Sequence, residues 1–93
     1  MGKTIRQLIV ELLEEEQLSA LDLSGALGVK EKEIFEHLEH IARSLKPAKR
    51  LVVEPAQCRS CDFQFKKRNR IKPPSRCPLC KSEFIQRPHF SIL

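Results

Sequence analysis

The chain has 93 residues, of which 41% are hydrophobic and 31% are charged, and its formal net charge is +5. This length fits one domain or a domain with a small appendage, and a core this small often needs a metal or disulfides for stability. No apolar run approaches the roughly 18 residues of a membrane span. The start, MGKTIRQL, has neither an apolar signal region nor the myristoylation pattern. We therefore expect a cytoplasmic protein without membrane segments.

Three segments of the N-terminal half have the apolar spacing of amphipathic helices. The first segment carries Ile5, Leu8, Ile9, Leu12 and Leu13. The second is short and runs from Ser19 to Gly28, a residue suited to the left-handed conformation at a helix end. The third stops before Pro47 and carries Ile34, Leu38, Ile41 and Leu45.

The residues at the N-termini of these helices differ in how well they can cap the helix. Thr4 with Gln7 fits a capping box, and Ser19 with Asp22 has the same spacing at the second helix. Lys30 is a poor cap for the third helix. A short helix, a glycine-containing turn and a longer helix together predict a helix-turn-helix.

The third helix has residues that favour DNA binding and residues that oppose it. Its basic residues Lys30, Lys32 and Arg43 lie on the face opposite the apolar stripe, together with Glu36 and Glu39. Glutamates next to phosphates oppose binding, although a glutamate can accept a hydrogen bond from a cytosine amino group. Base reading by this helix and its absence both remain open.

Four cysteines form the strongest motif of the chain. Cys58, Cys61, Cys77 and Cys80 follow the spacing CxxC–x15–CxxC, which is typical of a four-cysteine zinc site. Two CxxC turns facing each other complete a tetrahedron of thiolates and leave no position open for a substrate water. We therefore expect one structural zinc ion. Iron is the alternative, since four thiolates also suit it; the basic segment next to the site favours zinc.

Two segments that flank the cysteines have the pattern of strands. Residues 50–54 contain a β-branched run, and residues 89–93 alternate apolar and polar positions. A lone strand is unstable, so we expect the two to pair beside the helices. The predicted fold is an α+β winged helix-turn-helix with the ribbon inserted at the wing. Its parts are 1–57 (helix-turn-helix and first wing strand), 58–84 (zinc ribbon) and 85–93 (returning strand).

The run LVVEPAQCRSCDFQFKKRNRIKPPSRCPLCKSEFIQRPHF, behind a helix-turn-helix, is similar to predicted transcriptional regulators of archaea and bacteria. In that family a winged helix carries a rubredoxin-like zinc ribbon. The resemblance spans essentially the whole chain and is most specific from Pro55 to Phe90. It implies zinc on the four cysteines and a DNA-binding regulatory role. The chain departs from the family pattern at Asp62, where a knuckle glycine is expected, and at Phe84, where a tryptophan is common.

Charge divides the chain into two halves. Residues 1–45 carry five basic against nine acidic residues, a balance of −4, whereas residues 46–93 carry twelve against three, a balance of +9. This asymmetry predicts that DNA meets the C-terminal half. The expected phosphate contacts come from the linker and the ribbon: Lys46, Lys49, Arg50, Lys66, Lys67, Arg68, Arg70 and Lys72.

Two other binding functions stay open. The acidic helical half suits a basic protein partner, which would make the chain an interaction module of the transcription machinery. RNA binding by the ribbon is the other alternative, for which Phe63 and Phe65 are candidate stacking residues but are better suited to packing the ribbon. The sequence shows no open metal site, no nucleophile–base pair and no phosphate-binding glycine loop. We therefore do not expect an enzyme.

Overall fold

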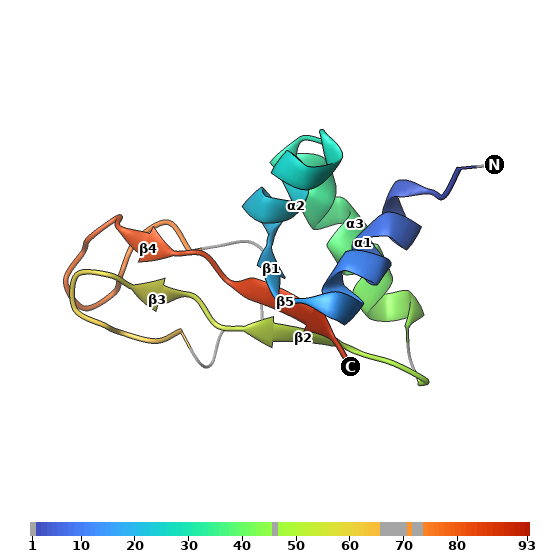
Figure 1. Ribbon diagram of the computed structural model, residues 1–93. Coiled ribbons are helices and arrows are strands. Elements are labelled where there is room, and N and C mark those ends of the chain that lie inside the picture. Colours follow the sequence, from blue (N-terminus) through green and yellow to red (C-terminus); the bar gives the residue numbers. More distant parts are fainter. Residues whose placement is uncertain (1, 46, 66–70, 72–73) are drawn as a thin grey trace.

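The structure is a computed structural model that describes residues 2–45, 47–65, 71 and 74–93. Within these residues, three helices and five strands follow one another along the chain (Figure 1). Their bounds are α1 Ile5–Glu15, β1 Leu18–Ser19, α2 Ala20–Leu27, α3 Glu31–Ser44, β2 Leu51–Glu54, β3 Gln57–Cys58, β4 Ile85–Gln86 and β5 His89–Ile92.

The helix starts have the predicted caps. Thr4 and Gln7 form a capping box at α1, and Ser19 and Asp22 form one at α2. Each box satisfies two backbone N–H groups that the first turn of a helix leaves without partners. Gly28 ends α2 in the left-handed conformation, with φ 67°. These predictions from sequence are confirmed.

Helix α3 begins without a side-chain cap, as Lys30 predicts. Glu31 and Glu33 in its first turn and Arg43 in its last turn place charges that suit the helix dipole. The carboxylate of Glu31 also forms an ion pair with Arg87, which precedes β5. This ion pair therefore joins the start of α3 to the segment between β4 and β5.

A three-stranded antiparallel sheet packs against the helices in the order β1-β5-β2. The predicted pairing of β2 with β5 is present, with Leu51 opposite Ile92 and Glu54 opposite His89. Strand β1 was not expected; it has two residues, and Leu18 lies opposite Phe90. Because β5 lies between β1 and β2, it is the central strand of this sheet.

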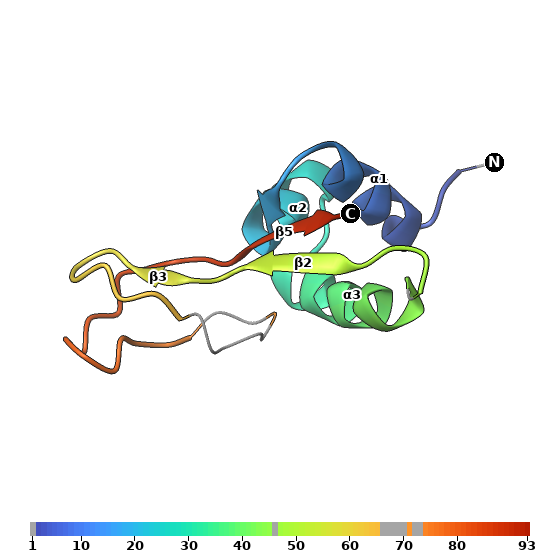
Figure 2. The ribbon, with the colours of Figure 1, turned by 90° about the horizontal axis from the view of Figure 1, so that it is seen from below.

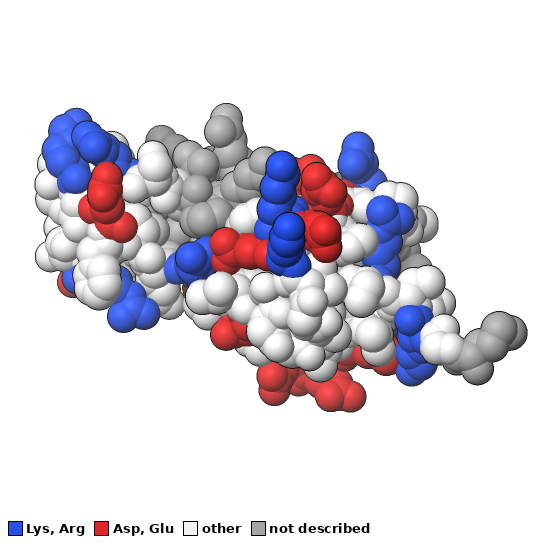
Figure 3. All heavy atoms as spheres, turned by 90° about the horizontal axis from the view of Figure 1, so that it is seen from above, with Lys and Arg blue, Asp and Glu red and all other residues white. Residues whose placement is uncertain are grey.

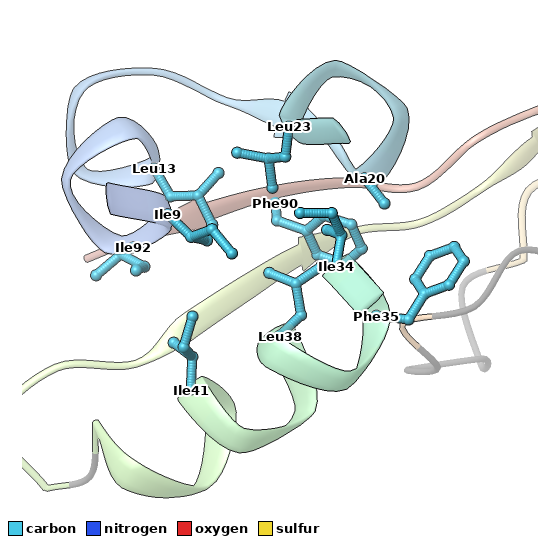
Figure 4. Packing of buried hydrophobic residues seen from close by; sticks show 10 residues of the cluster. All are labelled: Ile9, Leu13, Ala20, Leu23, Ile34, Phe35, Leu38, Ile41, Phe90 and Ile92. Atoms are coloured by element: carbon cyan, nitrogen blue, oxygen red, sulfur yellow. The ribbon is translucent and has the colours of Figure 1, made fainter. Parts of the chain in front are cut away.

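The core lies between the helices and the central strand (Figure 4). Its fully buried members come from the three helices and β5: Ile9, Leu13, Leu23, Ile34, Leu38 and Phe90. Phe35, which follows Ile34 at the edge of the apolar stripe of α3, is also buried with this cluster. It is therefore a packing residue and not a surface aromatic.

The segment between β2 and β5 projects away from the helices as a ribbon (Figures 1 and 2). Strands β3 and β4 form a two-stranded antiparallel sheet in which Gln57 lies opposite Gln86 and Cys58 opposite Ile85. The molecule is elongated as a result, with extents of 49 × 29 × 20 Å. Two neighbouring strands of the helical part thus lead directly into the two strands of the ribbon.

In the described part of the chain, no helix combines the length and the apolar composition required to span a membrane.

Replacing Phe90 by Ala is expected to lower the free energy of unfolding by about 3–5 kcal/mol, because the ring is fully buried at the centre of the core. Denaturant unfolding of the metal-loaded protein, followed by circular dichroism, measures this change. The control is Leu93→Ala, which removes a side chain that is 72% exposed and should change stability by less than about 0.5 kcal/mol. Equal losses in the two variants would contradict this account of the core.

Candidate metal centre

Two turns with the same backbone hydrogen bonds carry the four cysteines. In the first turn, the Asp62 N–H donates to the Cys58 carbonyl at 3.0 Å, and the Cys58 N–H donates to the Phe63 carbonyl at 2.8 Å. The second turn repeats both bonds at the same positions relative to Cys77, also at 3.0 and 2.8 Å. The two CxxC segments therefore form equivalent knuckles.

Each knuckle requires a left-handed residue directly after its second cysteine. Asp62 and Lys81 occupy these positions, and both have φ 63°. A glycine would adopt this conformation without strain, whereas an aspartate tolerates it better than most residues and a lysine less well. The missing glycines thus leave the knuckle conformation intact and introduce local backbone strain.

The two knuckles bring the four thiol groups together. The Sγ atoms of Cys58, Cys61, Cys77 and Cys80 all lie within 4.8 Å of one another. The shortest separations lie between knuckles, at 3.5 Å for Cys58–Cys80 and 3.5 Å for Cys61–Cys77. A tetrahedral zinc site with sulfur at about 2.3 Å from the metal has its sulfurs about 3.8 Å apart. The donor set and its spacing fit one metal ion held by four thiolates, which would cross-link the two knuckles.

Burial distinguishes the first cysteine of each knuckle from the second. Cys58 and Cys77 are fully buried, whereas Cys61 and Cys80 are exposed. The metal position is therefore open to solvent on one side. The hydroxyls of Ser60 and Ser82 lie 2.9 Å apart across the two knuckles and form a further link between them.

Backbone N–H groups favour the thiolate form of Cys58. Burial raises the pKa of this thiol, but hydrogen bonds from the backbone N–H groups of Cys61 and Ser60, together with those from the thiols of Cys80 and Cys61, outweigh burial and bring the pKa to about 7. Without a metal, Cys58 therefore loses its proton more readily than Cys61.

The thiols of the second cysteines hold their protons more firmly. The backbone N–H of Phe63 lowers the pKa of Cys61, but partial burial and the neighbouring thiols of Cys77 and Cys80 together raise it to about 12. For Cys80, the Ser82 N–H lowers the pKa, while burial and Cys58 raise it, and the net direction is upward. A divalent metal favours the thiolate and reverses this balance.

The aromatic residues of the ribbon have different surroundings. Phe63 and Phe65 are half-buried and pack edge to face, with ring centroids 5.0 Å apart and an angle of 84° between the rings. The prediction that they pack the ribbon is confirmed. Phe84 is 64% exposed, and the Arg59 guanidinium lies over its ring. This pair was not among the expected binding residues, because the sequence alone did not distinguish Phe84 from the packed aromatics.

The expected nucleic-acid contacts are only partly described by the structure. Six of them lie outside the described residues: Lys46, Lys66, Lys67, Arg68, Arg70 and Lys72. The other five are exposed: Lys30, Lys32, Arg43, Lys49 and Arg50. Lys49 forms an ion pair with Glu14 of α1. Of these exposed residues, Lys32 and Arg43 lie on α3 and Lys30 is its N-cap residue, whereas Lys49 and Arg50 directly precede β2.

Two histidines on α3 lie away from the cysteine cluster. His37 accepts a hydrogen bond at Nδ1 from Nε of Arg6 at 3.1 Å, and His40 is exposed. Over the described residues, the four cysteines are the group of side chains arranged to hold a metal ion. The histidines thus belong to the helix surface and not to the cysteine cluster.

Replacing Lys81 by Gly is expected to stabilise the metal-bound ribbon by about 1 kcal/mol relative to Lys81→Ala, because only glycine adopts φ 63° without strain. Both variants lack the lysine charge, so the comparison isolates the backbone. Competition with a chelator at fixed pH measures metal affinity, and thermal unfolding of the loaded protein gives a second readout. If the alanine variant were the more stable of the two, the strain at this position would be refuted.

Metal affinity is expected to fall steeply as the pH falls. Above a pH of about 7 Cys58 is already a thiolate, while the raised pKa values of Cys61 and Cys80 keep these thiols protonated until a metal displaces their protons. With two or more protons released per metal, affinity should drop by about 100-fold or more for each pH unit between pH 9 and 7.5. A chelator titration at several pH values tests this, and an affinity independent of pH would contradict it.

Comparisons with known proteins agree with this arrangement. Residues 4–53 match the family model "PF0610-like, N-terminal", and residues 55–93 match "PF0610 rubredoxin-like zinc beta-ribbon domain". The solution NMR structure of protein PF0610 from Pyrococcus furiosus is 39% identical, with a TM-score of 0.81, covering 100% of this chain and 92% of that chain. A search of curated proteins gives no match. The chain therefore belongs to the PF0610-like family and combines its N-terminal domain with its rubredoxin-like zinc ribbon.

Proposed function

We propose that the protein is a zinc-containing winged-helix protein that binds double-stranded DNA and acts in transcription regulation. The observation that carries this proposal is the strand order β1-β5-β2 beside three helices. A winged helix has this arrangement, with its wing formed by the last two strands. Here those strands are β2 and β5, and the ribbon occupies the position of the wing tip.

The connection between α2 and α3 supports a helix-turn-helix. Helix α2 ends at Gly28 in the left-handed conformation, and α3 begins three residues later at Glu31. Helix α2 is short and α3 is longer, as in DNA-binding helix-turn-helix motifs. The fold by itself is weak evidence for an activity, so the charges on its surface matter.

The exposed face of α3 carries acidic residues next to its basic residues. Glu33, Glu36 and Glu39 are exposed, and the last two lie one turn from Lys32 and Arg43 respectively. At this spacing opposite charges on a helix partly compensate each other. The helix therefore offers little net positive charge to phosphates.

Charge on the described surface is mixed (Figure 3). On the face shown, Lys and Arg side chains lie among Asp and Glu side chains over the helical part, and further Lys and Arg side chains lie at the ribbon end. The densest basic run of the sequence, residues 66–72, connects the two knuckles. In the proposed mode this run supplies most of the phosphate contacts, and the metal would link the two knuckles between which the run lies.

The metal in this proposal is a structural zinc ion. Four thiolates fill its coordination sphere, so no position remains for a substrate. Its role is to hold the ribbon in place beside the winged helix. The metal joins the two knuckles and thereby stabilises the fold of the ribbon. Removal of the metal should therefore impair DNA binding through loss of ribbon structure.

Double substitution Lys67→Ala/Arg68→Ala is expected to weaken binding to a random-sequence 20-base-pair duplex and to reduce the salt slope by about one unit per lost contact. Fluorescence anisotropy at two or more salt concentrations measures both quantities. The matched control is Lys3→Ala/Arg6→Ala, which removes the same charge from the opposite end of the chain and should leave the slope unchanged.

Absence of duplex binding at low salt would overturn the proposal. A protein partner that is captured by the loaded protein after nuclease treatment would then favour the alternative function, an interaction module with an acidic helical surface. The exposed glutamates of α3 are the observation on which that alternative depends.

A further inference from the structure

One aromatic side chain on the ribbon is presented to solvent by a well-fixed backbone. Phe84 is 64% exposed, whereas Phe35 and Phe90 are buried and the remaining two phenylalanines are half-buried. The Phe84 N–H donates to Oγ of Ser82 at 3.0 Å, and its carbonyl accepts from the Arg59 N–H at 2.9 Å. A single exposed apolar side chain is common on protein surfaces, so the surroundings of this ring decide whether it can bind a ligand.

The exposed ring borders a concave site with polar walls. The site has a volume of about 340 Å³ and is lined by Gln57, Cys58, Arg59, Asp62, Phe84 and Gln86. Its two glutamines are direct strand partners across β3 and β4. The Arg59 guanidinium lies 5.6 Å from the centroid of the Phe84 ring. An aromatic face, a guanidinium, two amides and a carboxylate thus meet in one place.

We propose that this concave site binds one unpaired nucleobase of a single-stranded nucleic acid. Proteins that bind single strands stack bases on aromatic rings and on guanidinium planes, and bind the base edges by hydrogen bonds. The Arg59 guanidinium lies over one face of the Phe84 ring, so the stacking surfaces on offer are the other face of the ring and the outer face of the guanidinium. The amides of Gln57 and Gln86 both donate and accept, and the Asp62 carboxylate accepts from a ring N–H or an exocyclic amino group.

A paired base does not suit this site. In a duplex both faces of a base are covered by its neighbours, so a protein ring reaches a face only where the base is unstacked. The site therefore selects single strands, loops or ends, while the helices and the basic run contact the duplex. This inference rests on the proposed function in one respect only: both require a nucleic acid as the partner.

The metal and the base site share one knuckle. Cys58 lines the concavity, and Asp62 lies directly after Cys61 in the left-handed position of that knuckle. The arrangement of Arg59 and Asp62 around the site therefore depends on the knuckle conformation. All tests accordingly use the metal-loaded protein, with metal content measured for each variant.

The first test compares Phe84→Ala with Leu79→Ala. Leu79 is 69% exposed on the second knuckle, so its removal is a matched loss of exposed apolar surface outside the concave site. Anisotropy is measured with an eight-nucleotide RNA, the DNA of the same sequence and a 20-base-pair duplex. Phe84→Ala should weaken binding to the single strands by about tenfold or more, with duplex affinity changed less than twofold. Leu79→Ala should leave all three affinities unchanged.

The second test reports on the ring itself. The chain contains no tryptophan, so Phe84→Trp introduces a single fluorescent ring at the proposed stacking position. Its single-strand affinity should equal or exceed that of the wild type, and its fluorescence should be quenched on binding. Asp62→Asn retains tolerance for the left-handed backbone and should change the preference among oligonucleotides of different base composition without abolishing the quenching.

Each outcome decides between the two proposals. Unchanged single-strand affinity in Phe84→Ala, or fluorescence of Phe84→Trp that does not change at saturation, overturns the base site. Equal losses for single strands and duplex also overturn it, because the effect would then lie in general ribbon binding. Single-strand binding that needs Phe84 without any duplex binding upholds the site and refutes the duplex-binding function. Tighter binding to RNA or to single-stranded DNA identifies the natural source of the base.

Discussion

The antiparallel pairing of β2 with β5 is the constraint on which both halves of the molecule depend. On the side of the helices, this pairing places Phe90 in the centre of the core. Reciprocal backbone bonds between Arg50 and Leu93, at 3.1 and 3.2 Å, extend the ladder beyond the strands. On the other side, the same two strands lead into the ribbon. The direction of the ribbon is therefore set by a ladder that the helical core stabilises.

The ribbon itself has few means of apolar stabilisation. Phe63 and Phe65 pack against each other but remain half-buried, and the larger hydrophobic core lies among the helices. A small segment of this kind depends on a metal for its fold. The metal cross-link between the knuckles thus stabilises the ribbon, whereas buried side chains stabilise the helical part.

The sequence was sufficient to predict features that depend on local chemistry. Capping residues such as Ser19, the cysteine spacing and the pairing of β2 with β5 follow from short-range patterns and backbone pairing. Strand β1 could not be predicted, because its two residues are too few to show a period. The exposure of Phe84 depends on which side of the ribbon each ring faces, and that is a property of the tertiary structure. The left-handed conformation of Lys81 is likewise imposed by its knuckle against local preference.

The place where the ribbon leaves the sheet has a consequence for how the protein is assembled from parts. Glu54 and His89 lie opposite each other at the end of the β2–β5 ladder. The two ends of the inserted segment are thus one strand spacing apart, about 5 Å, a gap that an ordinary hairpin turn closes. Removing or exchanging the ribbon at this junction would leave the β2–β5 ladder in place, but it would also remove the Glu31–Arg87 ion pair and the packing of Ile71 against the helical core.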